Sequence, residues 1–100
     1  MRHFVISITY TAPLEKIEEI RPSHRNFLQI GYDIGFILCS GPRNPMTGGI
    51  VIARADNKEE IELLFQKDPY QINKLADYEF IEFDPVKHQD FLSDWVNKER

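Results

Sequence analysis

Cysteine is almost absent from this chain of 100 residues, in which Cys39 stands alone. A single thiol cannot close an internal disulfide, so a disulfide-stapled secreted domain is excluded. Cys39 lies within an apolar run, where a free cysteine usually packs as a small hydrophobic residue, and we expect it in the core. The three histidines, His3, His24 and His88, are far apart and join no ligand pattern, so no metal site is expected.

Positive charge is also scarce, with 12 Lys and Arg against 16 Asp and Glu and a formal net charge of −4. The basic residues are scattered and lack the clustered face that nucleic acid requires. There is no cationic amphipathic helix and no apolar run long enough to span a bilayer. The N-terminal residues lack a cleavage-type end, so we expect a cytoplasmic protein without nucleic-acid or membrane partners.

Phosphate-binding loops and nucleophile elbows are missing as well, because neither G-x-G-x-x-G nor G-x-S-x-G occurs. We therefore expect no cofactor. The apolar fraction of 42% and the charged fraction of 28% are ordinary for a globular chain and exclude disorder. The length fits one domain over residues 1–100, with its core in residues 3–84.

The hydrophobic spacing predicts alternating strands and helices. Residues 3–11 alternate as a strand does, and residues 14–33 follow helical spacing. Proline breaks or kinks a helix interior, so the first helix is expected to end near Ile20 and restart at Pro22. The remaining predictions are strands at 35–41, 49–55 and 77–83, a second helix capped by Asp56, a turn or short helix at 70–75, and a last helix over 86–98 with Phe91, Leu92, Trp95 and Val96 as its apolar stripe.

The predicted order, β-α-β-β-α-β followed by an extra helix, is the split βαβ arrangement of an α+β, ferredoxin-like domain. Its antiparallel sheet carries two helices on one face only. Ile50 and Ile52 nevertheless oppose Val51 and Ala53 on the other side of the same strand, so both faces are apolar. We therefore predict a homodimer that buries the second face against another copy.

The candidate chemistry starts with His24, which shares one side of the first helix with Arg21 and Leu28. That side is otherwise apolar, so His24 points inward, either as a hydrogen-bonded core residue or as an acid–base group. The second reading needs a partner, and Asp68 at the end of the second helix is a candidate. Asp68 before Pro69 also fits the simpler role of ending a helix.

Small residues mark two further candidates. In Ser40-Gly41-Pro42 the glycine allows a ligand to approach the backbone and the serine offers a hydroxyl, although an ordinary turn explains the same residues. Gly48-Gly49 fits either a mobile lip for a pocket or the start of a strand.

Together these residues resemble the YCII-related (YciI-like) proteins over Phe4 to about Phe83. The resemblance is carried by Arg21-Pro22-Ser23-His24 with Leu28 and Gly31, by Ser40-Gly41-Pro42, by Gly48-Gly49, and by Asp68-Pro69-Tyr70. It implies a dimeric α/β barrel in which two ferredoxin-like sheets pack face to face. It also implies a His24–Asp68 active-site dyad. The chain departs from the family pattern in having Pro22 directly after Arg21 and an added helix beyond Phe83.

The family includes an enzyme of chloroaromatic degradation and is similar in fold to muconolactone isomerases. The resemblance thus implies proton transfer or elimination on a small cyclic or carbonyl compound, without a cofactor. Arg21 would then hold a substrate carboxylate, and Ser40 with the Gly41 backbone would bind a developing oxyanion, with Pro42 and Tyr70 as further substrate-binding residues. The alternative is a dimeric module that binds a small ligand without chemistry, or that accompanies another protein.

Overall fold

The computed structural model describes residues 1–99, whose elements follow the expected β-α-β-β-α-β order. They are β1 (Arg2–Tyr10), α1 (Leu14–Asp33), β2 (Ile37–Pro42), β3 (Gly48–Ala55), α2 (Lys58–Phe65), α3 (Pro69–Ile72), β4 (Ala76–Phe83), a 3₁₀ turn at Asp90–Leu92, and α4 (Ser93–Asn97). The four strands form one antiparallel sheet in the order β2-β3-β1-β4. This confirms the α+β, ferredoxin-like class.

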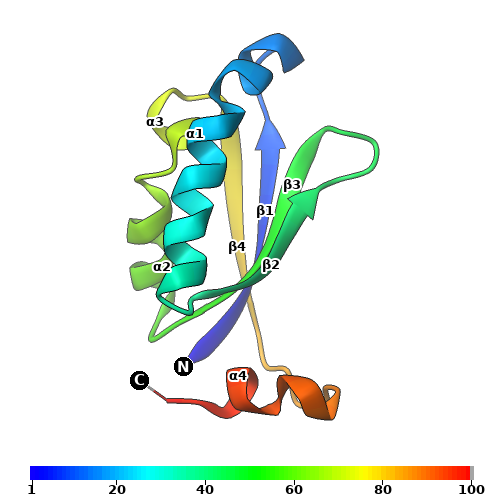
Figure 1. The fold of residues 1–100 in the computed structure, drawn as a ribbon, viewed down its shortest axis with the longest axis vertical. Coiled ribbons are helices and arrows are strands. Elements are labelled where there is room, and N and C mark those ends of the chain that lie inside the picture. The colour runs from blue at the N-terminus through cyan, green and yellow to red at the C-terminus, as the bar shows by residue number, and fades with distance from the viewer. Residues whose placement is uncertain (100) are drawn as a thin grey trace.

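The core lies between the sheet and the helices, because α1, α2 and α3 all pack on one sheet face (Figure 1). The inward positions of the two central strands are fully buried at alternate residues, as a sheet with one covered face requires. These positions are Phe4, Ile6 and Ile8 in β1, and Val51, Ala53 and Ala55 in β3. The helices contribute Ile17, Phe27, Leu28, Ile61 and Phe65 to the same layer.

Helix α1 runs through Pro22 without the predicted break. Proline has no N–H to donate to the carbonyl four residues earlier, which here belongs to Glu18. Both Glu18 and Pro22 are exposed, so water can satisfy that carbonyl. The apolar stripe of Ile17, Phe27 and Leu28 is buried on the opposite side of the helix, and its packing outweighs the lost hydrogen bond.

The cap of α2 lies one residue later than expected. Asn57, rather than Asp56, is the N-cap, and its side chain accepts a hydrogen bond from the backbone N–H of Glu60 at 2.8 Å. The carboxylate of Glu60 in turn accepts the backbone N–H of Asp56 at 2.8 Å. The side-chain cap is therefore present one residue later than predicted, and the returning bond from Glu60 goes to the residue before the N-cap rather than to the N-cap itself.

Strand β2 contains an irregularity that overturns the expected burial of Cys39. The register shifts between Ile37 and Cys39, so Ile37 pairs with the inward Ala53 while Cys39 pairs with the outward Ile52. A bulge of this kind reverses the alternation of side chains along a strand. Cys39 is consequently exposed, and Ser40, its neighbour, faces the helices opposite Val51.

The predicted last helix over 86–98 is much shorter, with only the 3₁₀ turn and α4 in its place. Val86, at the start of the predicted helix, is 92% exposed and Phe91 is 83% exposed, whereas the other three residues of the predicted apolar stripe are half-buried. A short helix without packing is unstable in water, which explains the loss of the first turns. Trp95 is the anchor: its ring lies 5.3 Å from that of His3, and the Arg54 guanidinium lies 5.0 Å from its centre.

The second face of the sheet bears apolar side chains, as expected from the sequence. Ile81 and Phe83 are 46% and 39% exposed, and Ile50 and Ile52 on β3 are half-buried. The C-terminal segment lies at the end of the sheet near the N-terminus (Figure 1), where Trp95 contacts His3 and Arg54. The sheet is open in the single chain, and the dimeric barrel stays a prediction.

Candidate functional site

His24 and Asp68, which are 44 residues apart in the sequence, form a direct hydrogen bond. His24 Nδ1 lies 2.8 Å from Asp68 Oδ1. The Asp68 side chain is completely buried, and that of His24 is 12% exposed. Within residues 1–99 the other ring nitrogen, Nε2, makes no hydrogen bond. A buried carboxylate that orients one nitrogen and leaves the other open is the arrangement of an acid–base histidine.

Asp68 reaches this position because it starts α3. As the N-cap it accepts the backbone N–H of Tyr70 at 3.1 Å, and Pro69 occupies the first helical position. The sequence left a helix-ending role and a dyad role open. Asp68 does not end α2, which stops at Phe65 with Gln66 as its C-cap, and instead begins α3. Its role in a dyad stays a prediction. Segment α3, rather than α2, brings the carboxylate against α1.

Tyr78 on β4 completes the surroundings of the carboxylate. Its hydroxyl donates to Asp68 Oδ2 at 2.5 Å. Burial, followed by the Asp68 charge and this hydrogen bond, raises the pKa of Tyr78 well above its usual range. Tyr78 therefore remains a neutral donor, and both carboxylate oxygens of Asp68 are engaged.

Tyr70 supports the histidine ring from one side. The two rings are stacked with 4.0 Å between centres and 13° between planes, which fixes the orientation of His24. The Tyr70 hydroxyl is buried and makes no hydrogen bond of regular geometry to residues 1–99. Burial raises the pKa of Tyr70, the Tyr10 hydroxyl adds to this effect, and the nearby Arg21 guanidinium opposes it.

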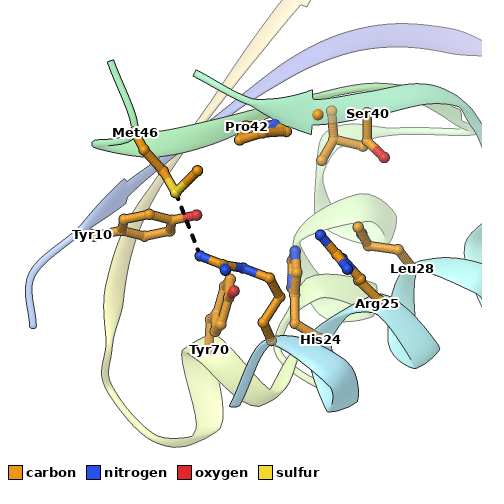
Figure 2. A pocket seen from close by; sticks show the side chains of 11 residues that line it. Tyr10, His24, Arg25, Leu28, Ser40, Pro42, Met46 and Tyr70 are labelled. Atoms are coloured by element: carbon orange, nitrogen blue, oxygen red, sulfur yellow. Dashed lines mark hydrogen bonds between the residues drawn. The ribbon is translucent and has the colours of Figure 1, made fainter. Parts of the chain in front are cut away.

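His24 opens into a cavity of about 260 Å³ between α1 and the β2 edge (Figure 2). Its lining residues come from β1, α1, β2, β3, the loop of residues 43–47 and α3: Tyr10, Arg21, His24, Arg25, Leu28, Ser40, Gly41, Pro42, Met46, Val51 and Tyr70. An engineered cavity of about 150 Å³ holds one benzene molecule. The space is thus suited to one substituted ring.

All the residues that the sequence singled out as substrate-binding line this cavity, namely Arg21, Ser40, Gly41, Pro42 and Tyr70. Asp68 lies behind His24 and does not reach the cavity. Ser40 is held by the Tyr32 hydroxyl at 2.6 Å, and a side chain added to Gly41 would meet no protein atom within 4 Å.

Gly48 and Gly49 begin β3 and are not part of the lining. A Cβ on Gly48 would lie 1.8 Å from the Ile8 carbonyl oxygen, so this residue must be glycine for packing reasons. The structure therefore supports the strand-start reading of Gly48-Gly49 and not the lip.

Tyr78, Tyr10, Arg25 and Met46 are site residues that the sequence reasoning missed. Strand alternation places Tyr78 on the inner face, but it gives no sign of the contact with Asp68. Arg25 directly follows His24, and a count of basic residues in the first helix would have singled it out. Met46 approaches Arg21 from the loop, with 3.7 Å between Arg21 Nη2 and the Met46 sulfur.

The sequence of this domain matches a known protein family. The family model of the YCII-related domain matches residues 1–84. The chain belongs to the YCII-related domain family. The match ends just after β4, so the 3₁₀ turn and α4 lie outside the YCII-related domain. No curated protein matches the chain.

A solved structure similar to this YCII-related chain is 5-chloro-2-hydroxyhydroquinone dehydrochlorinase (TftG) from Burkholderia phenoliruptrix AC1100, in complex with 2,5-dihydroxybenzoquinone. It is 20% identical, with a TM-score of 0.69, and the alignment covers 89% of this chain and 97% of that one. This similarity supports the fold.

Residues 1–99 lack two features that would indicate other functions. No helix in that range is long and apolar enough to cross a membrane. The same residues contain no group of three or more His, Cys, Asp or Glu side chains placed to hold a metal ion.

Proposed function

We propose that this protein is a small enzyme that uses His24 and Asp68 for proton transfer or elimination on a small cyclic or carbonyl substrate. The observation that carries the proposal is the 2.8 Å bond between His24 Nδ1 and a fully buried carboxylate, with His24 lining a cavity. A histidine placed in this way is oriented on one side and available for proton transfer on the other.

In the proposed reaction, His24 Nε2 removes a proton from an acidic C–H or O–H group of the substrate. The released electron pair forms a new double bond, and in an elimination the leaving group departs with its own electron pair. The imidazolium that forms is stabilised by Asp68, whose charge is itself supported by Tyr78 and the Tyr70 N–H. General base catalysis of this kind contributes about 10²–10⁴-fold.

The remaining roles are assigned to the lining of the cavity. Arg21 holds an acidic group of the substrate, because it is charged and makes no ion pair with residues 1–99. When Tyr32 donates to Ser40, the Ser40 hydroxyl proton is free to stabilise an oxyanion. The partner role of the Gly41 backbone is part of the same hypothesis, as are substrate contacts of Pro42 and Tyr70.

The test is turnover of chlorinated hydroxyhydroquinones, haloaromatic acids and lactones, followed by chloride release and ultraviolet absorbance. On any compound that is converted, His24→Gln should lower kcat/KM by about 10²–10⁴-fold. His88→Gln is the matched control, because this histidine lies outside the cavity and contacts the Gln89 carbonyl of its own segment. Conversion that is unaffected by His24→Gln removes the dyad from the mechanism, and ligands that bind but emerge unchanged favour the non-catalytic module.

We also propose that two copies pack through the open sheet face, with its exposed Ile81 and Phe83. Sedimentation at micromolar concentration should give a dimer, and Ile81→Glu should shift it to a monomer. Ile72→Glu on α3 replaces an isoleucine that is 63% exposed on the helical side and should leave the dimer intact. A wild-type monomer contradicts this part of the proposal.

A further inference from the structure

The cavity beside His24 has an unusual charge balance. Two of its lining side chains are arginines and none is an aspartate or a glutamate. Arg21 and Arg25 are four residues apart on α1, so they lie on the same side of the helix, and two like charges at this spacing cost helix stability. Neither guanidinium makes an ion pair with any residue that the structure describes.

The two guanidinium groups lie at different ends of the cavity. Arg21 contacts Met46 of the loop and lies close to the hydroxyls of Tyr10 and Tyr70. Burial works to lower the pKa of Arg21, but these two hydroxyls outweigh it and raise that pKa. Arg25 extends toward the side of the cavity bordered by Leu28 and Ser40 (Figure 2).

Leu28 and Val51 add apolar surface to the same cavity. The His24 ring points into the cavity next to Arg25 (Figure 2). A ligand that matches this lining therefore has an apolar ring, which contacts Leu28 and Val51, and a negatively charged oxygen group directed at each of the two arginines. The volume of about 260 Å³ leaves room for one ring with its substituents.

We propose that the cavity binds a small planar ring carrying one acidic group at each end, with Arg21 holding one group and Arg25 the other. This inference deepens the proposed function, because it takes the cavity beside His24 as the substrate site and names the substrate class. The buried Tyr70 hydroxyl supplies an additional donor at the Arg21 end, where it has no regular hydrogen bond within residues 1–99.

The test uses three ring compounds of nearly equal shape and different charge: isophthalate, 3-carbamoylbenzoate and isophthalamide. Dissociation constants are measured by calorimetry and by NMR at fixed ionic strength and neutral pH. Each added carboxylate should lower the dissociation constant about tenfold. This is the lower end of the range for a hydrogen bond to a charged group, and it applies here because Arg25 is exposed to solvent. Equal affinities for the three compounds, or no binding of isophthalate, overturn the inference.

Variants assign the two ends. Arg21→Gln and Arg25→Gln should each reduce the preference for isophthalate over 3-carbamoylbenzoate from about tenfold to under about twofold. Lys58→Gln removes the same charge from an exposed position outside the cavity and should change no affinity by more than about twofold. A loss of preference that Lys58→Gln reproduces reflects net charge alone and contradicts the assignment.

This outcome is independent of catalysis. If isophthalate binds best and His24→Gln leaves turnover intact, the two-ended acid site stands while the proposed dyad fails. If the three compounds bind equally and turnover depends on His24, the dyad stands while the substrate class named here is wrong.

Discussion

Replacing Tyr78 by phenylalanine tests the hydrogen-bond network beneath His24. The substitution removes one hydroxyl without opening a cavity, and it leaves Asp68 Oδ2 without its donor. Because Asp68 is fully buried, water cannot replace that donor without rearrangement. A hydrogen bond to a charged group contributes about 1.5–3 kcal/mol, so Tyr78→Phe should lower the free energy of unfolding by about 2 kcal/mol.

Urea denaturation at neutral pH measures this change, and Tyr32→Phe is the matched control. The Tyr32 hydroxyl bonds the exposed, neutral Ser40, so its loss should cost no more than about 0.5–1 kcal/mol. A double-mutant cycle with Asp68→Asn isolates the charge, since the asparagine amide can donate to the Tyr78 oxygen. In that background Tyr78→Phe should cost less than about 1 kcal/mol. Equal losses in both backgrounds would refute the claim that Tyr78 supports an ionised Asp68.

Two further predictions concern packing and pH. Gly31→Ala places a Cβ 2.3 Å from Ile37 Cδ1 and 2.8 Å from Ile37 Cγ1, so it should destabilise the fold by about 1–2 kcal/mol despite the better helix propensity of alanine. Ile37→Val removes only Cδ1, so in urea denaturation the loss caused by Gly31→Ala should be smaller in the Ile37→Val background than in the wild type. Burial, the N-terminal amine and Arg54 lower the pKa of His3 in the folded protein. In the unfolded chain His3 keeps its ordinary pKa of about 6.5, so as the pH falls through this value the unfolded chain takes up the proton more readily than the folded protein does. Stability should therefore fall from pH 7.5 to pH 5.5 more steeply in the wild type than in His3→Gln, and parallel pH profiles of the two proteins would contradict this reasoning.

The hydrophobic pattern was sufficient to predict the element order and the inner faces of the central strands. Periodicity reports average burial, however, and it could not show local exceptions. Pro22 continues α1 because the carbonyl it leaves free faces water, and this depends on which side of the helix packs. The last helix is short because Val86 and Phe91 stay exposed, while Trp95 is held by His3 and Arg54, which lie far away in the sequence.

The candidate site also depends on contacts that the hydrophobic pattern could not predict. Asp68 was a candidate partner of His24 from the sequence pattern, the family resemblance implied the same pair, and the structure brings the two side chains to 2.8 Å. Tyr78 carried no signal, because its contact with Asp68 arises only when β4 joins the sheet edge. The bulge between Ile37 and Cys39 is equally hidden from the sequence. Regular alternation from the buried Ile37 would direct Cys39 toward the helices and Ser40 away from them.

That bulge links the fold to the proposed chemistry. By reversing the side-chain alternation, it moves the Cys39 thiol to the open sheet face and turns the Ser40 hydroxyl toward Tyr32 and the cavity. A regular strand would instead offer a thiol at this wall of the site. The departure from ideal strand geometry therefore has a consequence for function: a hydroxyl donor, and not an oxidisable sulfur, faces the ring that His24 is proposed to deprotonate.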